Sequence, residues 1–512
     1  MKIINSKSSV RKSGGQNPKQ IWNFRFYSIG IVLIFFCALF LFCGRKIETI
    51  VIVYDTPPST LDPHLRNEIL TTSILCNIYE PLVDFDANMK MVPALAEYWE
   101  RIDSLTWRFY LRNGVKFHNN KKLDPDDVIY SIYRPFNLPE SRYQTLRDYL
   151  DTIIIEDTNI VLLKLKKSHA FLLYDLSGIA IIPKGFEPSN QRPCGTGPYE
   201  FVKLDKEQLE LKKFKPYWNN NQYFEQVKFM FIPEVQKRIE ALEKGKADII
   251  TYIPLKEHER LKKAGRIIAT TGVATRYLEM EIKKFPFNRI EFRKAVNLGL
   301  NREHLVKDIY NGYATPANQY ISQGLFGYDY TLPQFLYNPD SARKLIKLLG
   351  ALPEIEFDYA EVRTDIAKAI IEDLRNIGLK VKPNPLPVEK YWQRINSGKS
   401  DFYLIGSVPT TGEGISTLRS YFHTKEQNKG LGLLNNTGYS NKTVDTLIEK
   451  MIACSELRNC AFLANRVQRI LIADLPRIPV VWEKEIYGVS PNLIWTPRLD
   501  EKILIKEIKR IE

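Results

Sequence analysis

Residues 354–406 alternate between strand and helix patterns, and this alternation constrains the fold more than any other stretch of the chain. EIEFDYA, at 354–360, predicts a strand because apolar and aromatic residues alternate with polar ones. A helix follows, with Thr364 as its N-cap and Gly378 at its end. Its apolar residues recur at helical spacing on one face, namely at Ile366, Ile370, Leu374 and Ile377.

A second helix and two further strands extend this pattern. LKVKPNP, at 379–385, predicts the next strand, and DFYLIG, at 401–406, predicts a third. Between them, residues 388–397 predict a short helix that ends at Gly398. Because parallel strands need crossover connections and helices supply them, we expect a β-α-β-α-β unit with a parallel sheet.

The loop after the third strand is a candidate ligand site on topology alone. Open parallel sheets bind ligands beyond the carboxyl ends of their strands. In this chain the loop is SVPTTGEG, Ser407–Gly414.

The rest of the chain shows the same layering of helices on strands. TIVIVYD, at 49–55, predicts a strand, and 83–194 is rich in strand patterns such as TWRFYLRNGVKF and TNIVLLKLKK. A helix over 234–244 ends at Gly245 and leads into a strand in ADIITYI, at 247–253. A chain of 512 residues is long enough for two or three domains. The predicted fold class is α/β.

The charge distribution argues against a nucleic-acid-binding protein. The formal net charge is +14, but Lys and Glu are interspersed, as in Lys237–Glu240. A nucleic-acid-binding protein usually gathers Lys and Arg on an arm or on one helix face. We interpret the charges as a solvated surface of mixed sign and expect no nucleic-acid partner.

The first 44 residues are a basic arm followed by an uncharged apolar stretch. The arm carries Lys and Arg but no Asp or Glu, and the apolar stretch runs from Phe26 to Cys43. Its length lies between those of a signal peptide and a transmembrane helix. Because basic flanks stay in the cytoplasm, the chain after Lys46 is expected to be exported.

Cys43 closes the apolar stretch and precedes Gly44, where a bacterial lipoprotein would carry its acylated cysteine. Such signals have a small residue before the cysteine, whereas this chain has Phe42. Lipidation at Cys43 and an uncleaved helical anchor therefore both stay open. Either one would tether the protein to a membrane.

Four further cysteines follow, at Cys76, Cys194, Cys454 and Cys460. An exported protein can form disulfides. Cys454 and Cys460 could pair if the segment between them is a loop, whereas a helix would point them to different faces. Buried free thiols are the interpretation that we favour.

The sequence carries no catalytic or metal-binding signature. It lacks the phosphate-binding G-x-x-x-x-G-K-[ST] loop and the G-x-S-x-G elbow. Its six histidines do not pair at i+2, i+3 or i+4, and none lies in a Cys/His cluster. We interpret His64 and His118 as structural hydrogen-bonding residues. We expect no enzymatic activity, no metal site and no cofactor.

Several short blocks, in order along the chain, resemble a known family. The blocks are LDPH at 61–64, IYEPL at 78–82, PALAEYW at 93–99, TWRFYLRNGVKFH at 106–118, DDV at 126–128, GTGPY at 195–199, Asn288, FRKAV at 292–296 and YSN at 439–441. Their order and spacing resemble the solute-binding proteins of ABC importers of the peptide, dipeptide and nickel class, family 5, over about residues 50–490. We expect most of the blocks to build the scaffold and not to touch ligand.

The resemblance implies a two-lobed periplasmic-binding-protein fold of type II, in the large class with an extra inserted subdomain. Two α/β lobes would close on the ligand around a hinge. The implied parts are 1–44 as arm and anchor, 45–82, 195–277 and 487–512 as lobe I, 83–194 as inserted subdomain, and 278–486 as lobe II.

The resemblance also implies two regions that contact the ligand. One is the loop Leu65–Thr71, in which Asn67 and Ile69 match contact positions. The other is Gly406–Gly414, which topology selects independently. A peptide would add there as an extra strand, bound by backbone groups. The implied ligand-binding residues of this second loop are Gly406, Ser407, Val408, Thr410 and Glu413.

The second loop departs from the family pattern G-W-x-x-D-x-x-D-P, in which an aspartate pairs with the ammonium of the peptide. Ser407 replaces the aromatic residue, Thr410 the first aspartate and Gly414 the proline, while Glu413 keeps an acid at the second position. Either Glu413 takes over the ammonium, or the ligand lacks a free N-terminus.

The predicted function is that of an ABC-importer receptor, which captures oligopeptides or a related small solute and delivers them to the permease and ATPase subunits. We expect a monomer in the periplasm or cell envelope, anchored to the membrane by its N-terminus. The alternative is an envelope-anchored binding or structural protein that kept the fold but lost peptide transport.

Overall fold

The structure is a computed structural model that describes residues 48–65, 68–138, 146–188, 192–221, 223–408, 412–427 and 430–511. The chain divides into two units, Met1–Glu48 and Thr49–Glu512. In the described residues, no helix has both the length and the apolar character needed to cross a membrane. The basic arm, the apolar stretch and Cys43 lie outside the described residues.

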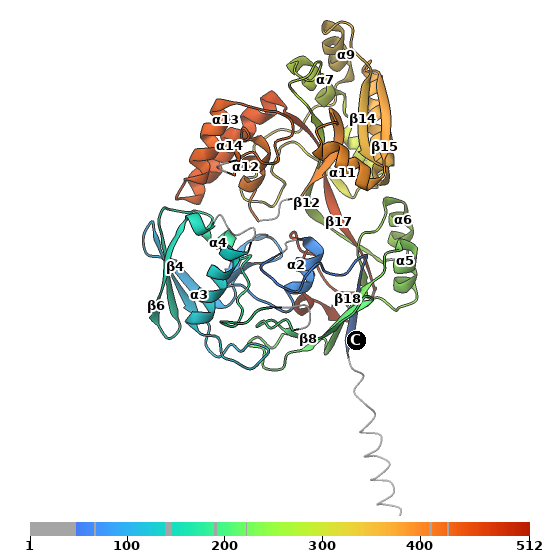
Figure 1. Ribbon diagram of the computed structural model, residues 1–512. Helices are drawn as coiled ribbons and strands as arrows, with labels where there is room; N and C mark the ends of the chain where they lie inside the picture. The colour runs from blue at the N-terminus through green and yellow to red at the C-terminus, as the bar shows by residue number, and fades with distance from the viewer. Residues whose placement is uncertain are drawn as a thin grey trace, which may run out of the picture. The chain divides into compact units, whose positions relative to one another are not determined.

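A long mixed sheet runs through the second unit (Figure 1). Its strands are β1 (Thr49–Tyr54), β8 (Tyr199–Leu204), β9 (Gln208–Lys213), β10 (Gln226–Phe231), β11 (Ile249–Ile250), β12 (Ile267–Met280), β13 (Ala314–Pro316), β14 (Ile355–Ala360), β15 (Val381–Leu386), β16 (Phe402–Ser407) and β17 (Arg477–Val489). They follow the order β15-β14-β16-β12-β17-β11-β1-β10-β9-β8, and β13 pairs with β17.

The predicted strand at 49–55 forms β1, which runs parallel to β10 and β11. Two helices, α5 (Val235–Glu243) and α6 (Leu255–Lys263), lie beside this part of the sheet (Figure 1). The predicted helix and its stop are confirmed, since α5 ends shortly before Gly245, whose φ is +67°. The strand after it is shorter than predicted, because only the two residues of β11 pair.

A separate four-stranded antiparallel sheet has the order β4-β5-β7-β6. Its strands are β4 (Ala96–Arg101), β5 (Thr106–Leu111), β6 (Leu150–Asp157) and β7 (Ile160–Leu165), with α3 (Pro125–Tyr133) and α4 (Leu172–Leu176) beside them. This part has its own core, in which Phe109, Val128 and Leu163 are buried. The N-terminus of α3 carries a capping box, because Asp124 and Asp127 each accept a hydrogen bond from the backbone of the other.

The predicted β-α-β-α-β unit is confirmed. It consists of β14, α10 (Thr364–Asn376), β15, α11 (Val388–Asn396) and β16, and β14 pairs in parallel with both β15 and β16. The predicted apolar face of α10 is buried, with Ile366, Ile370, Leu374 and Ile377 at most 1% exposed. Gly378 follows the helix with a φ of +96°.

The prediction that Thr364 is the N-cap of α10 is wrong. Residues Glu361–Arg363 form a 3-10 turn, η4, and Arg363 occupies the N-cap position without a side-chain cap. Thr364 is the first helical residue, and its hydroxyl donates to the carbonyl of Glu361 at 2.7 Å. The turn thus uses the threonine hydroxyl that a cap would need.

The two longest strands, β12 and β17, connect the parts of the sheet. They pair antiparallel from Ile267–Gly488 to Glu279–Arg477, with a register shift between Thr270 and Ala274. One end of β17 pairs with β11, and the last residues of β12 pair with β16. These strands therefore join the β1 side of the molecule to the β-α-β-α-β unit.

Helices and short elements complete the second unit. The helices are α2 (Ile69–Leu75), α7 (Ile290–Gly299), α8 (Arg302–His304), α9 (Pro339–Leu348), α12 (Ile415–Phe422), α13 (Lys442–Ile452) and α14 (Leu457–Asp474). The short elements are β2 (Val83–Phe85), β3 (Met91–Pro93), β18 (Leu493–Ile494), β19 (Lys509–Arg510), η1 (Arg134–Asn137), η3 (Leu305–Ile309) and η6 (Ile505–Glu507). Helices α12, α13 and α14 lie together (Figure 1) around a core that includes Leu418, Ile448 and Val467.

Cys454 and Cys460 form a disulfide, with their Cα atoms 5.8 Å apart. They can pair because α13 ends at Ile452 and α14 begins at Leu457, which leaves a loop between the helices. The favoured interpretation of free thiols is therefore wrong for this pair. Cys194 is free and buried, as predicted, whereas Cys76 is free but only partly buried.

Candidate ligand-binding site

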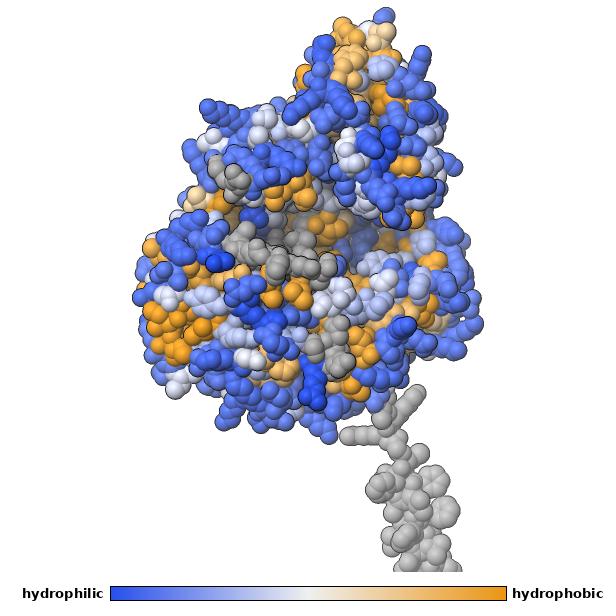
Figure 2. Space-filling view, in the orientation of Figure 1, coloured by the Kyte–Doolittle hydropathy of each residue, from blue (hydrophilic) through white to orange (hydrophobic). Residues whose placement is uncertain are grey.

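A cavity with a volume of about 130 Å³ lies where distant segments of the second unit meet. Figure 2 shows the surface hollowed between the part that carries α12–α14 and the part that carries α2–α4. The cavity is lined by residues of α2, β2, α4, β12 and the C-terminal segment, including Ile69, Thr72, Asp84, Phe85, Met89, Tyr174, Ser177, Val273, Leu325, Gly412, Leu499, Asp500, Glu501 and Lys502. A mainly apolar wall with a few polar groups is the usual character of a small-solute site.

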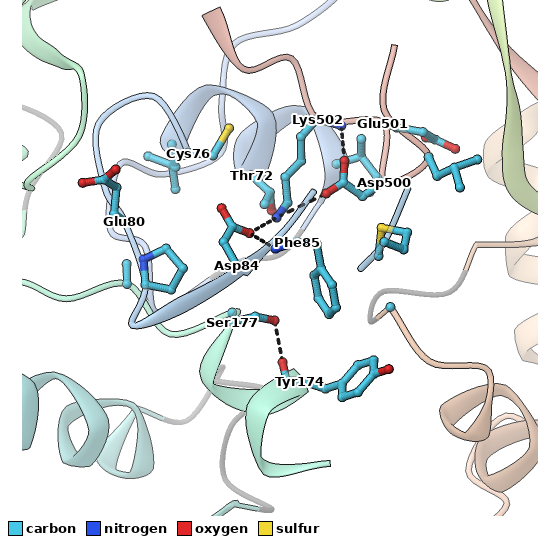
Figure 3. A pocket seen from close by; sticks show the side chains of 18 of the residues that line it. Thr72, Cys76, Glu80, Asp84, Phe85, Tyr174, Ser177, Asp500, Glu501 and Lys502 are labelled. Atoms are coloured by element: carbon cyan, nitrogen blue, oxygen red, sulfur yellow. Dashed lines mark hydrogen bonds and ion pairs between the residues drawn. The ribbon is translucent and has the colours of Figure 1, made fainter. Parts of the chain in front are cut away.

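Charged residues gather at one side of the cavity (Figure 3). The ammonium of Lys502 lies 3.8 Å from Asp84 and 3.6 Å from Asp500. Arg498 also pairs with Asp500, at 2.8 Å. Burial favours the neutral form of Asp500, but Lys502 and Arg498 outweigh it and keep the pKa of this carboxyl below its ordinary value.

Glu501 lines the same cavity in a left-handed backbone conformation, with a φ of +60°. Burial raises its pKa to about 7, and the charges of Asp500 and Glu483 add to the effect. Burial likewise raises the pKa of Glu485, on β17, well above its ordinary value, and the charge of Glu501 adds to it. A carboxyl with a raised pKa in a cavity is a candidate for a functional group. Strained backbone at the same residue supports that interpretation.

Phe85 and Tyr174 form an aromatic wall, with ring centroids 5.4 Å apart. Burial raises the pKa of Tyr174 to about 12, and the negative charge of Glu413 contributes. Gly412 lies against this wall, because a Cβ at Gly412 would lie 2.9 Å from Cζ of Phe85 and 2.7 Å from the methyl group of the neighbouring Met89. A side chain at residue 412 would therefore require the ends of the Met89 and Phe85 side chains to shift.

The sequence blocks beside the cavity support its wall. The buried carboxylate of Glu80 accepts hydrogen bonds from Thr196 at 3.0 Å, Tyr217 at 2.6 Å and Trp218 at 3.0 Å. The backbone N–H of Gly197 donates to the carbonyl of Ile78 at 2.9 Å. Hydrogen bonds therefore connect the blocks IYEPL and GTGPY, as expected of scaffold residues.

His64 and His118 are structural, as predicted. The Nε2 atom of His64 bonds to the carbonyl of Ala180 at 2.8 Å, and that of His118 to the carbonyl of Gly197 at 3.0 Å. Burial lowers the pKa of each imidazole to about 4.

Among the predicted ligand residues that the structure describes, some line the cavity and others do not. Ile69 begins α2 and lines the cavity. Asn67 and Thr410 lie outside the described residues. Gly406 and Ser407 lie in β16, opposite Arg276 and Thr275 of β12, and are not among the residues that line the cavity.

Gly406 lies under the guanidinium of Arg276, because a Cβ there would be 2.0 Å from Nη1. Arg276 in turn pairs with Glu483 of β17 at 2.6 Å, and Arg363 pairs with the same carboxylate at 3.1 Å. Burial opposes ionisation of Glu483, but the two guanidinium groups lower its pKa to about 2. Val408 follows β16 and is 41% exposed.

Glu413 is buried, at 8% exposure, in the segment that precedes α12. Its carboxylate accepts a hydrogen bond from the backbone N–H of Ser416 at 2.8 Å. The carboxylate therefore lies at the N-terminal end of α12, where the helix dipole favours a negative charge.

Sequence reasoning named no ligand residue in β2, in α4 or after residue 487. The side chains of Asp84, Tyr174 and Asp500–Lys502 meet only through the tertiary fold. One sequence signal for the last of these is the charged run Asp500-Glu501-Lys502 beside the apolar Ile503 and Leu504.

Comparison with known proteins gives a family for this arrangement. The profile described as "Bacterial extracellular solute-binding proteins, family 5 Middle" matches residues 90–429. The glutathione-binding protein GsiB of Escherichia coli O6:K15:H31 is 27% identical over 481 residues, which cover 89% of this chain and 93% of that protein.

Two solved structures share the fold. The substrate-binding protein CtaP of Listeria monocytogenes gives a TM-score of 0.83 at 19% identity, covering 91% of this chain and 100% of that one. The periplasmic binding protein DppA of Helicobacter pylori, in complex with the peptide STSA, gives a TM-score of 0.74 at 23% identity. The match covers 91% of this chain and 99% of that one. The predicted type II periplasmic-binding-protein fold is confirmed. The chain belongs to the bacterial extracellular solute-binding proteins of family 5, and it is a binding protein, not an enzyme.

Proposed function

We propose that the protein is the extracellular receptor of an ABC importer, and that it captures short peptides or a related small solute for a permease. The main support for this proposal is the cavity. On one side it is lined by α2, β2, α4 and the C-terminal segment, and on the other side by Val273, Leu325 and Gly412. It combines an apolar and aromatic wall with both signs of charge, which suits a zwitterionic solute with apolar side chains. Glutathione in the name of one relative and the tetrapeptide in DppA support a peptide ligand.

We further propose the jaw-like arrangement that the sequence implied. Lobe I would comprise 45–82, 195–277 and 487–512, with 83–194 inserted, and lobe II would comprise 278–486. The separate core of the four-stranded sheet and the connecting strands β12 and β17 support this division. A bend at the register shift in β12 would let the two sides close on a ligand.

The receptor would be held at the outer face of a membrane by residues 1–44. The basic arm, the apolar stretch and the Cys43-Gly44 pair support this part of the proposal. A Cys43→Ser protein that runs at the same mass as the unchanged protein and stays in the membrane would favour an uncleaved helix over lipidation.

Ligand binding is tested on the full-length protein in detergent. Native mass spectrometry identifies any co-purified solute, and thermal unfolding follows titration with reduced glutathione, with Ser-Thr-Ser-Ala and with a mixture of free amino acids as control. A peptide at 100-fold its Kd should stabilise the protein by about 2.7 kcal/mol. Full stabilisation by the free amino acids, with none by either peptide, would contradict the proposed ligand class.

The alternative of a protein that kept the fold but lost transport is not favoured by the comparisons. A gene placed beside permease and ATPase genes would support the receptor. The alternative would be supported if the protein purifies without a ligand and if no added peptide changes its radius of gyration.

A further inference from the structure

His423 and two glutamates form a compact group at the C-terminal end of α12. His423 directly follows the helix, and its side chain is fully buried. Glu426 lies in the loop after it, and Glu449 lies on α13. One ligand atom from each of the three side chains lies within 4.8 Å of those from the other two.

The imidazole of His423 has a fixed orientation. Its Nδ1 atom donates to the carbonyl of Thr424 at 2.6 Å, so Nε2 is the ring nitrogen that can bind a ligand. Among the described residues Nε2 finds no hydrogen-bond partner, and it lies 3.8 Å from a carboxylate oxygen of Glu449. That separation is too long for a hydrogen bond but suits two ligands that flank one cation.

The backbone around the group is tightly held. The carbonyl of His423 accepts from the Asn435 amide at 2.9 Å, and a Cβ at Gly432 would lie only 2.3 Å from it. Glu426 and Leu431 exchange two backbone hydrogen bonds, at 2.9 and 3.2 Å. A metal-binding histidine usually donates a hydrogen bond from its other ring nitrogen to a backbone carbonyl or a carboxylate, as Nδ1 of His423 does here.

We propose that His423, Glu426 and Glu449 bind one divalent cation of the zinc class. Imidazole and carboxylate ligands suit Zn²⁺, whereas Mg²⁺ and Ca²⁺ prefer oxygen ligands alone. Three protein ligands leave a position for water. The cation joins the C-terminal end of α12 to α13. The candidate ligand loop precedes the other end of α12. The role of the cation is therefore to hold this helix in place.

The sequence pattern does not reveal this group, because the chain has no closely paired histidines. The ligands are a single histidine, a glutamate three positions on and a glutamate from the next helix, and only the packing of α12 against α13 brings them together.

The test uses the full-length protein in detergent, prepared without a histidine tag and stripped with EDTA. Zn²⁺ is titrated by calorimetry, and bound zinc is counted by elemental analysis. We expect one Zn²⁺ per chain. Glu449→Gln should weaken zinc binding by about tenfold or more, because it removes an anionic ligand on an exposed helix face.

Two matched variants control for surface binding. Glu354→Gln removes an exposed carboxylate elsewhere, and His304→Gln removes an imidazole that pairs with Asp308 at 2.8 Å. Both should bind zinc like the unchanged protein. Zinc should raise the Tm of the unchanged protein but not that of Glu449→Gln. The proposal is overturned if no zinc binds, if Glu449→Gln binds normally, if His304→Gln abolishes binding, or if Mg²⁺ binds as tightly as Zn²⁺.

Discussion

Gly412 lies so close to Phe85 that a Cβ at Gly412 would be 2.9 Å from the Cζ atom of that ring. Gly412 belongs to the loop after β16, and Phe85 ends β2 on the opposite side of the cavity. This contact brings the two sides of the cavity together at one point. A side chain at residue 412 would therefore press against the ends of the Phe85 and Met89 side chains.

Gly412→Val should weaken peptide affinity by about 1–3 kcal/mol, because the added methyl groups overpack the contact with Phe85 and Met89. Small-angle scattering should give a larger radius of gyration for the variant than for the unchanged protein at saturating peptide. Adding Met89→Ala, which opens space beside residue 412, should restore part of the affinity. Unchanged affinity in Gly412→Val would show that this contact does not limit closure.

The β-α-β-α-β unit could be predicted because its signals are local. Helical spacing from Ile366 to Ile377 and the stop at Gly378 lie within one short stretch, and the structure follows both. The N-cap at Thr364 was mispredicted for a local reason, since the η4 turn ahead of it takes up its hydroxyl.

The walls of the cavity could not be predicted in the same way. Asp84, Tyr174 and Lys502 come from segments far apart in the chain, and no local pattern marks their meeting. The family resemblance directed attention to the loop around Glu413, whereas the charged side of the cavity comes from residues after β17. Position in the fold, and not residue type, makes Glu501 unusual.

Stability should depend on pH through Glu501. Its pKa rises from an ordinary 4.5 to about 7 in the folded protein. Between these values the folded state holds a proton that the unfolded state has lost, so the free energy of unfolding falls as pH rises from about 4.5 to 7. Glu501→Gln removes this loss and should be more stable than the unchanged protein by roughly 2–3 kcal/mol at pH 8, but equally stable at pH 4.

Urea denaturation at both pH values measures this difference. Comparison with the variant is needed because the lowered pKa values of His64 and His118 act in the opposite direction, reducing stability as pH falls from about 6.5 to 4. The titratable groups that interact electrostatically with Glu501 include Asp500, Glu483, Glu485, Tyr252 and Tyr487. A stability gap that is equal at pH 4 and pH 8 would show that Glu501 keeps its ordinary pKa.

The disulfide between Cys454 and Cys460 should stabilise the protein modestly, because it closes a short loop between α13 and α14. Cys454→Ser should lower the free energy of unfolding by about 2 kcal/mol. Reduction with dithiothreitol should lower the unchanged protein to the same level and leave the variant unaffected. Equal stability of the oxidised and reduced unchanged protein would contradict a stabilising role.

Among the glycines of the sequence blocks that resemble the family, Gly195 is expected to tolerate a side chain least. A Cβ there would lie 2.1 Å from the carbonyl oxygen of Ile78, a backbone atom that cannot move aside. Gly195→Ala should therefore destabilise the protein by about 3 kcal/mol or more. Gly245→Ala is the matched control, since its φ of +67° costs about 1–2 kcal/mol while no neighbour lies within 4 Å. Equal thermal stability of the two variants would show that the segment around Ile78 adjusts.

Glu413 offers the sharpest test of how the ligand is held. Its carboxylate accepts from the backbone N–H of Ser416, so the residue has a structural role whether or not it meets an ammonium. Glu413→Ala removes both the acceptor and the charge, and it should lower stability by about 1 kcal/mol through loss of the helix-end contact.

Glu413→Gln separates the two roles, because the amide oxygen can still accept from Ser416 while the negative charge is gone. If Glu413 pairs with the ammonium of a peptide, this variant should bind a peptide with a free N-terminus more weakly by about 2–5 kcal/mol. Its Tm without ligand and its affinity for the N-acetylated peptide should stay close to those of the unchanged protein. Calorimetry with both peptides on both proteins completes the cycle. Equal affinity of the two proteins for the free peptide would assign the ammonium to another group, and the carboxylates of Asp84 and Glu501 in the cavity would be the next to test.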